Sequence, residues 1–302
     1  MKRFFNGHSL FILCSMIVLA SCSKNGGYGN TTSNGNNNNN NSTAPAAVLI
    51  SLKASPTLGN YLVDKDGRTL YIFGKDADGQ NHCTGDCLAA FPLFNLESIK
   101  AENLGAGLNL ADFGHFTNSA GRGQVTYKGW PLYYYAPLSN GSNDPEPAGQ
   151  TSGDGVGGIW FVAKPDYTIM IVDDQLLGHD GKDYKSDYSQ GTEVTRYFTD
   201  GKGVTLYTFT ADRANKNNWT KSDFSNNAIW PIYETDQVVV PSTLDKSKFG
   251  SIDVFGRKQL TYNGWPLYYF GQDGGVRGFN KGISFPSPGI WHVPIKDINA
   301  AP

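Results

Sequence analysis

One short pattern, Gly-x-(Thr/Pro)-Leu-Tyr-x-(Phe/Tyr), occurs four times in this chain, starting at Gly67, Gly129, Gly203 and Gly264. Each copy follows a short alternating segment and a glycine turn. Asn-Gly and Asp-Gly turns between such segments are typical of β-hairpins, because glycine accepts the positive φ that tight turns need. The tyrosine and the second aromatic residue lie two positions apart, so both project from one face of the outgoing strand. The sequence therefore predicts four related hairpins.

A longer repeat contains these hairpins. Residues 69–76, 91–94, 125–135 and 158–160 return in the same order as residues 205–212, 230–233, 260–270 and 289–291. Four blocks in one order indicate a tandem duplication. We expect an all-β chain with a first repeat domain over 48–165 and a second over 196–297, joined by a strand-like connecting segment, 166–195. The four hairpins could form two β domains or close into one propeller-like or barrel-like body.

The composition agrees with a β-rich, exported protein. Aromatic residues make up 13% of the chain, there are 36 glycines and only three methionines, and 25 Lys and Arg stand against 27 Asp and Glu. A formal net charge of −2 without a basic cluster argues against nucleic-acid binding, which needs grouped cations against the phosphate backbone.

The N-terminus predicts export. An apolar run over residues 10–20 is too short to span a bilayer but fits the core of a signal peptide, 1–21. It ends in Leu-Ala-Ser-Cys, which resembles the bacterial lipobox, where the cysteine is diacylated after cleavage. The alternative is an ordinary secretory signal that leaves Cys22 as an unpaired thiol. We expect Cys22 to be lipidated.

A low-complexity segment follows directly. Residues 22–47 are rich in Asn, Gly and Ser and cannot bury enough apolar surface to order themselves, so we expect a disordered tether with a reach of roughly 25–30 Å. Ser23 follows the lipidated cysteine in place of Asp, which favours the outer membrane by analogy with enteric bacteria. Whether the protein faces the periplasm or the cell surface stays open.

With these motifs, the chain resembles the bacterial secreted-repeat lipoproteins that carry a Tyr-x-aromatic-x-x-Asp motif. Three complete copies match this motif: Tyr71, Phe73 and Asp76; Tyr207, Phe209 and Asp212; and Tyr268, Phe270 and Asp273. The Gly-Trp-Pro-Leu-Tyr-Tyr and Cys-Thr-Gly-Asp-Cys segments are also typical. The resemblance covers residues 48–296 and implies a cell-envelope lipoprotein without an established molecular activity. It carries over no catalytic residue.

The motif carboxylates favour a structural role. In the remaining copy, Leu138 stands where the Asp is expected. A group that recurs in three hairpins and is lost from the fourth suggests turn chemistry, in which the carboxylate accepts backbone N–H groups. Cation binding is the alternative, although no calcium-loop pattern is present.

Of the four cysteines, Cys14 lies in the predicted signal peptide and Cys22 is the expected lipidation site, which leaves Cys83 and Cys87. A structural disulfide is the interpretation we favour, because an aromatic pair, Trp219 and Phe224, takes their place in the second repeat. A metal site that includes His82, or a redox pair, stays as an alternative. We expect no cofactor.

The repeated aromatic residues allow two interpretations. A possible ligand surface would contain Trp130, Tyr134, Trp265 and Tyr269, which could stack against a ligand. The alternative is that most of them belong to the core and to cross-strand pairs. Because neighbouring residues of a strand point to opposite faces, only some of these aromatic residues can lie on one ligand-binding surface.

Three classes of function follow. We expect a non-enzymatic envelope binding module with an unknown ligand or protein partner, which contacts the membrane only through its lipid. A metal- or redox-linked periplasmic protein that uses His82, Cys83 and Cys87 is the second class. A hydrolase of envelope polymers ranks lowest, because the sequence offers no catalytic constellation.

Overall fold

A computed structural model describes residues 46–117 and 121–302. The predicted signal peptide, the lipidation site at Cys22 and most of the predicted tether lie outside these residues. By their contacts, the described residues belong to one compact unit. We refer to residues 46–165 as the first half and to residues 166–302 as the second half.

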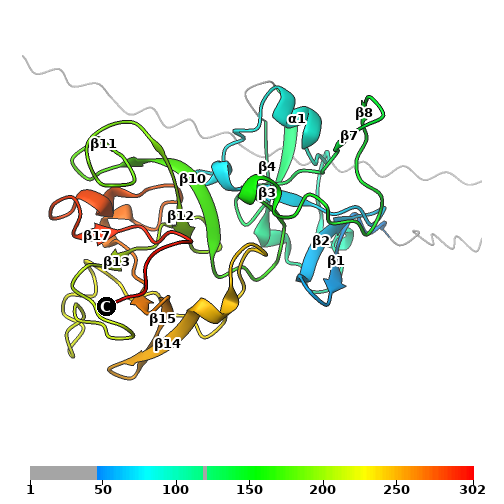
Figure 1. The fold of residues 1–302 in the computed structure, drawn as a ribbon. Helices are drawn as coiled ribbons and strands as arrows, with labels where there is room; N and C mark the ends of the chain where they lie inside the picture. Colours follow the sequence, from blue (N-terminus) through cyan, green and yellow to red (C-terminus); the bar gives the residue numbers. More distant parts are fainter. Residues whose placement is uncertain (1–45, 118–120) are drawn as a thin grey trace, which may run out of the picture. The chain divides into compact units, whose positions relative to one another are not determined.

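The chain is all-β, as predicted, with short strands, one short α-helix and several single-turn 3-10 helices in the described part (Figure 1). The elements of the first half are β1 (Ile50–Ser55), β2 (Gly59–Asp64), β3 (Tyr71–Phe73), α1 (Asp86–Ala90), β4 (Phe113–Thr117), β5 (Gly123–Tyr127), β6 (Trp130–Pro131), β7 (Leu138–Ser139), β8 (Ser142–Asn143) and β9 (Trp160–Val162). Those of the second half are β10 (Met170–Leu177), β11 (Asp183–Tyr184), β12 (Val194–Thr199), β13 (Thr208–Phe209), β14 (Phe249–Val254), β15 (Arg257–Tyr262), β16 (Trp265–Pro266) and β17 (Trp291–His292).

The two halves repeat the same antiparallel pairings. In the first half, β1 pairs with β2, β3 with β9, and β5 lies between β4 and β6. In the second half, the corresponding sheets are β10 with β12, β13 with β17, and β15 between β14 and β16. The tandem hairpin duplication is therefore confirmed. A closed propeller or barrel is not, because the described sheets contain two or three strands each and none closes.

The motif tyrosines join the two hairpins of each half. Tyr71 and Tyr133 exchange both backbone hydrogen bonds, at 2.8 and 2.9 Å, and Tyr207 and Tyr268 do the same at equal distances. Such a reciprocal pair relates the two hairpins of one half by an approximate twofold rotation. This arrangement brings each tyrosine side chain to the turn that follows the other tyrosine.

Stacked aromatic rings fill the space behind these bridges. Phe91 stacks on Trp160 with 3.5 Å between ring centroids, and Trp230 stacks on Trp291 at 3.7 Å. The motif tyrosines meet the same tryptophans edge to face, at 5.1 Å in both halves. Burial of these large rings supplies much of the hydrophobic stabilisation of each half.

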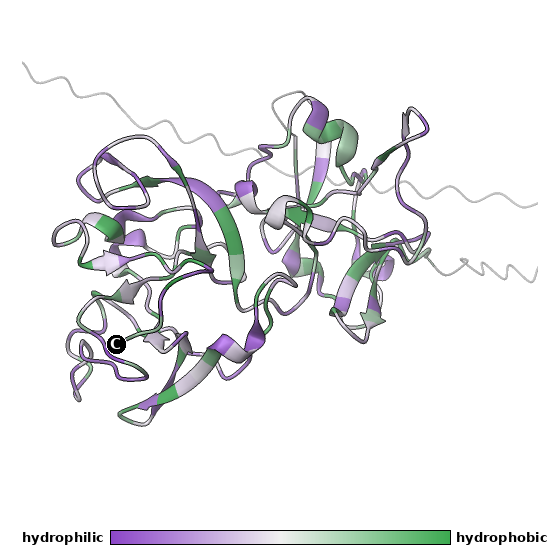
Figure 2. Cartoon of the chain, in the orientation of Figure 1, coloured by the Kyte–Doolittle hydropathy of each residue, from purple (hydrophilic) through white to green (hydrophobic). Residues whose placement is uncertain are grey.

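The connecting segment is part of the fold. Strand β10 pairs with β12 over six residue pairs, from Met170 opposite Thr199 to Gln175 opposite Val194. Its first residues are apolar and buried, whereas its middle is polar and half-buried, a change that Figure 2 shows along the ribbon. The backbone of β10 also approaches the first half, since a Cβ atom on Gly74 would lie 2.6 Å from the carbonyl oxygen of Ile171.

Arg277 of the second half lies against the first half. Its Nε donates to the carbonyl oxygen of Ala77 at 2.6 Å, and its guanidinium lies 4.6 Å from the ring centroid of Trp130. The indole N–H of Trp130 in turn donates to the carbonyl oxygen of Gly201 in the second half, at 2.9 Å. Burial lowers the pKa of Arg277 to about 10, so the side chain remains charged at neutral pH.

Candidate functional site

Each complete motif places its carboxylate beside the tyrosine of the neighbouring hairpin. The Tyr133 hydroxyl donates to Asp76 at 2.6 Å, and the Tyr268 hydroxyl donates to Asp212 at 2.8 Å. The Tyr207 hydroxyl donates to Asp273. The motif is therefore a reciprocal device, in which one hairpin supplies the acid and the other supplies the hydroxyl.

The second oxygen of each carboxylate organises the turn that follows it. Asp76 accepts the backbone N–H of the residue six positions later, at 2.8 Å, and Asp212 accepts its counterpart at 2.7 Å. Asp273 accepts the N–H of Lys281, eight positions later, at 3.0 Å. The expected turn role is thus present, and the tyrosine contact is an addition that the sequence did not reveal.

Glu146 supplies the acid that the remaining motif lacks. The Tyr71 hydroxyl donates to one oxygen of Glu146, and the other oxygen accepts the backbone N–H of Ser152 at 2.9 Å. Glu146 follows the small β7–β8 hairpin, which begins at Leu138, the position where the motif Asp is missing. The same pair of hydrogen bonds is therefore made from a different point in the sequence.

Burial perturbs the motif carboxylates strongly. Asp76 and Asp212 have no exposed surface, and Asp273 is 1% exposed. Burial raises the pKa of Asp76 to about 7 and that of Asp212 and Asp273 to about 6, against the opposing effect of their hydrogen bonds. Perturbed acids often mark active sites, but these three lie inside the core with both oxygens occupied.

A second pair of carboxylates holds the turns before the motif strands. Asp64 accepts the N–H groups of two turn residues with Oδ1 and the Tyr134 hydroxyl with Oδ2, at 2.9 Å. Asp200 does the same in the second half, where its Oδ2 accepts the Tyr269 hydroxyl at 2.9 Å. Tyr134 and Tyr269, which could have belonged to a ligand surface, are half-buried and bound to these turns.

The two repeated tryptophans also make internal contacts. Trp130 is 2% exposed and lies between the two halves. Trp265 is half-buried, and its indole N–H donates to the carbonyl oxygen of Asn299 at 2.8 Å. These contacts favour the interpretation of the aromatics as structural residues.

The predicted disulfide between Cys83 and Cys87 is present, with 5.3 Å between the Cα atoms. Cys83 is fully buried in the aromatic cluster that contains Phe73 and Trp160. Its counterpart Trp219 meets the equivalent rings of the second half, Phe209 and Trp291, at 5.5 and 5.3 Å. A covalent link in one half and an aromatic contact in the other therefore pin equivalent loops.

The disulfide leaves no thiolate for a metal or a redox reaction in this state. His82 bonds instead to Asp78, with 3.0 Å between Nε2 and Oδ1. Within the described residues, no group of three His, Cys, Asp or Glu side chains could hold a metal ion.

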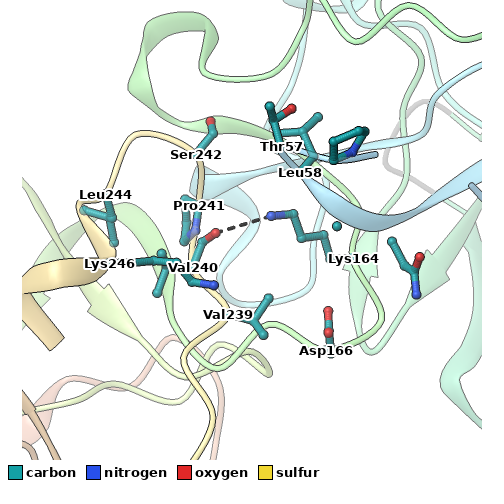
Figure 3. Close-up of a pocket in the computed structure, with 13 residues that line it drawn as sticks. Thr57, Leu58, Lys164, Asp166, Val239, Val240, Pro241, Ser242, Leu244 and Lys246 are labelled. Atoms are coloured by element: carbon teal, nitrogen blue, oxygen red, sulfur yellow. Dashed lines mark hydrogen bonds between the residues drawn. The ribbon is translucent and has the colours of Figure 1, made fainter. Parts of the chain in front are cut away.

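A cavity of about 410 Å³ lies where three chain segments meet, away from the motif residues (Figure 3). Its walls come from the β1–β2 turn, from the segment after β9 and from residues 239–246 of the second half. Lys164 projects into it after β9 and is only 8% exposed. Sequence reasoning missed this site, because nothing local to any of the three segments marks it.

Lys164 is poorly satisfied for a buried ammonium group. Its Nζ donates to the carbonyl oxygen of Val240 at 3.4 Å, and it lies 5.0 Å from the ring centroid of Tyr167. Burial lowers its pKa, and the charge of Lys246 adds to this effect, while Asp154 and Asp166 oppose it. An ammonium group has three N–H donors, so this site retains unused hydrogen-bonding capacity.

Comparison with known proteins agrees with the motifs. Residues 54–94 and 114–164 match the model of a family described as a secreted repeat of unknown function. In these residues, the chain is similar to that secreted repeat. The match confirms the resemblance and indicates an extracellular or envelope protein. No curated protein and no solved structure matches the chain.

The secreted repeat is matched in the first half alone, yet the second half keeps its sheets, its stacked rings and its tyrosine–carboxylate pairs. Among the residues that the structure describes, no helix has the length and apolar character to cross a membrane.

Proposed function

We propose that this protein is an envelope lipoprotein that acts as a non-enzymatic binding module, with its ligand site in the cavity around Lys164. The observation that carries the proposal is the contrast between the motif groups and the cavity. The motif carboxylates and tyrosines are bound to one another, whereas Lys246 and Asp166 in the cavity form no side-chain hydrogen bond to any residue that the structure describes.

The motif residues support a scaffold role instead of catalysis. A general acid or base must come within hydrogen-bond reach of a substrate. Asp76, Asp212 and Asp273 are closed off from solvent and already accept a tyrosine hydroxyl and a backbone N–H each. Their recurrence in both halves fits a repeated structural element.

The cavity supports a binding role. Pockets for small ligands commonly measure about 300–1,000 Å³ and combine apolar walls with a few polar groups. Here Leu58, Val239 and Leu244 provide apolar surface, and Lys164 and Asp166 provide charge. Ile295 stands in the second repeat where Lys164 stands in the first, so this lysine is not part of the repeated pattern.

The binding role can be tested by thermal unfolding of the full chain, purified in detergent, with a panel of small neutral sugars, acidic sugars and amino acids. A ligand that binds only the folded state raises the melting temperature. We expect at least one compound to do so, and the variant Ser242→Trp, which fills the cavity, to lose the effect. Ser251→Trp on the exposed strand β14 is the matched control. If no compound stabilises the protein, the binding role is wrong.

Membrane attachment is the second part of the proposal. We infer that signal peptide 1–21 is removed, that Cys22 is diacylated, and that the lipid holds the protein at the outer membrane, with the tether spacing the fold from the surface. The similarity of residues 54–94 and 114–164 to a secreted repeat supports export. Labelled palmitate should enter the wild-type protein and not Cys22→Ser, and this variant should be recovered in the soluble fraction. Equal labelling of both proteins would contradict the anchor.

A further inference from the structure

The polar groups of the cavity around Lys164 have a definite charge balance. Lys164 and Lys246 contribute two positive charges to its lining, and Asp166 contributes one negative charge. Asp154 lies close enough to affect Lys164 but does not line the cavity, and its Oδ1 accepts the N–H of Val162 at 2.9 Å. The lining therefore carries one unbalanced positive charge.

These groups are not used by the fold. Within residues 46–117 and 121–302, the Nζ atom of Lys246 and the carboxylate of Asp166 form no hydrogen bond or ion pair with the protein. The side chains of Asn60 and Ser242, in the same wall, also lack a hydrogen-bond partner there. Within the same residues, the buried Lys164 ammonium forms one hydrogen bond, and its length of 3.4 Å exceeds that of a typical N–H···O bond. Buried charges are normally paired, so this lysine calls for an anion.

The cavity does not belong to either repeat alone. Its walls combine the β1–β2 turn with residues of the second half, so the site exists only where the two halves of the duplication meet. Figure 3 shows the Lys164 side chain extended between these two walls, with its Nζ directed toward Val240. A ligand that enters between the walls would therefore meet the ammonium group.

We propose that the cavity binds a small organic anion through a carboxylate, held by Lys164 and Lys246, with Asn60 and Ser242 binding its neutral polar groups. The inference rests on the proposed binding function and gives it a ligand class. Charge-assisted hydrogen bonds to a carboxylate are stronger than neutral ones, and their strength increases in a partly desolvated site. Acidic sugars and amino acids are two classes of small molecule that carry a carboxylate. They differ in the polar groups around it.

Calorimetric titration of the full chain in detergent can test the inference with two matched pairs, each an acid and a neutral partner without a carboxylate: D-glucuronate with D-glucose, and N-acetyl-L-alanine with N-acetyl-L-alaninamide. We expect at least one acid to bind at least about tenfold more tightly than its neutral partner. Binding of glucuronate alone identifies a sugar acid, and binding of N-acetyl-L-alanine alone identifies an amino-acid carboxylate. Equal binding of an acid and its neutral partner would overturn the carboxylate assignment.

Substitutions can test which side chains bind the carboxylate. Lys164→Met and Lys246→Met should each weaken binding of the acid by about tenfold or more, whereas Lys258→Met on the exposed face of β15 should leave it unchanged. Lys246 is exposed, so its variant tests the idea even if Lys164→Met fails to fold. Asp166→Asn should tighten binding of the acid by a few fold, because it removes a repulsive charge, an effect that a purely structural role would not produce.

The failures of the two proposals are distinguishable. A neutral compound that stabilises the protein, and loses this effect in Ser242→Trp, keeps the binding role and removes the carboxylate assignment. Unchanged affinity of the acid in both lysine variants would also remove that assignment. If no compound of the whole panel binds, the binding role itself is lost.

Discussion

The two halves build the same hydrogen-bond pairs from different sequence positions. In the second half, both acids are motif residues, Asp212 and Asp273. In the first half, Asp76 is a motif residue, but Glu146 reaches the other tyrosine from beyond an inserted hairpin. The comparison teaches that the fold retains an acid at a point in space, and that its place in the sequence can change when a loop returns the carboxylate to that point.

The largest test of this equivalence is removal of the tyrosine hydroxyls. Tyr133→Phe and Tyr268→Phe each leave a fully buried carboxylate with one donor fewer, and each should lower the free energy of unfolding by about 1–3 kcal/mol in denaturant titrations. Tyr135→Phe is the control and should change stability by less than about 0.5 kcal/mol, because Phe270 already fills that position in the second half.

The other pair of tyrosines sharpens the comparison. In denaturant titrations, Tyr71→Phe should lower the free energy of unfolding less than Tyr207→Phe. The reason is that Glu146 has a longer side chain on a loop and can turn its carboxylate toward water more easily than Asp273. Equal losses in the two halves would mean that Glu146 is held as rigidly as a motif aspartate.

The loop closed by the Cys83–Cys87 disulfide and the equivalent loop held by Trp219 offer a second test of the equivalence, with a smaller expected change in stability. Replacing both Cys83 and Cys87 by Ala opens a five-residue ring and should cost at most about 2 kcal/mol by the loop-entropy model. Trp219→Ala should cost a similar amount, because it removes a half-buried ring from two aromatic contacts. Wild-type protein in reductant should melt like the double cysteine variant. A much larger loss for one of the two loops would break their equivalence.

The smallest expected difference between the two halves concerns the pH dependence of stability. The folded protein keeps the Asp76 proton up to about pH 7, whereas the unfolded chain loses it near the ordinary pKa of 3.8. Folding therefore takes up a proton between these values, and the free energy of unfolding falls as pH rises through this window. Asp212, with a pKa of about 6, contributes the same decline only up to about pH 6.

Neutral variants should separate the two acids. Asp76→Asn should flatten the stability profile up to about pH 7 and Asp212→Asn only up to about pH 6. The difference, between pH 6 and 7, is at most about 1.4 kcal/mol per pH unit for one proton. Melting temperatures at half-unit steps of pH measure it, and identical profiles for both variants would contradict the difference between the acids.

The sequence predicted the features that depend on neighbouring residues. Glycine turns, alternating strands, the stapled loop and the duplication are all encoded within short windows, so they could be recognised before the structure. Glu146 could not, because its partner Tyr71 lies 75 residues away and a loop of arbitrary length brings them together. The Lys164 cavity was also invisible, because its walls come from segments as far apart as residues 56 and 246 and its key property is the lack of a partner.

Arg277 has a consequence for how the chain can be divided. Its guanidinium contacts the carbonyl oxygen of Ala77 and the ring of Trp130, so the second half contains a side chain that needs the first half. A fragment made of the second half alone would leave this cation without its acceptor, and a fragment made of the first half alone would expose the surface that it covers. A cut between the two repeats therefore separates two pieces that depend on each other.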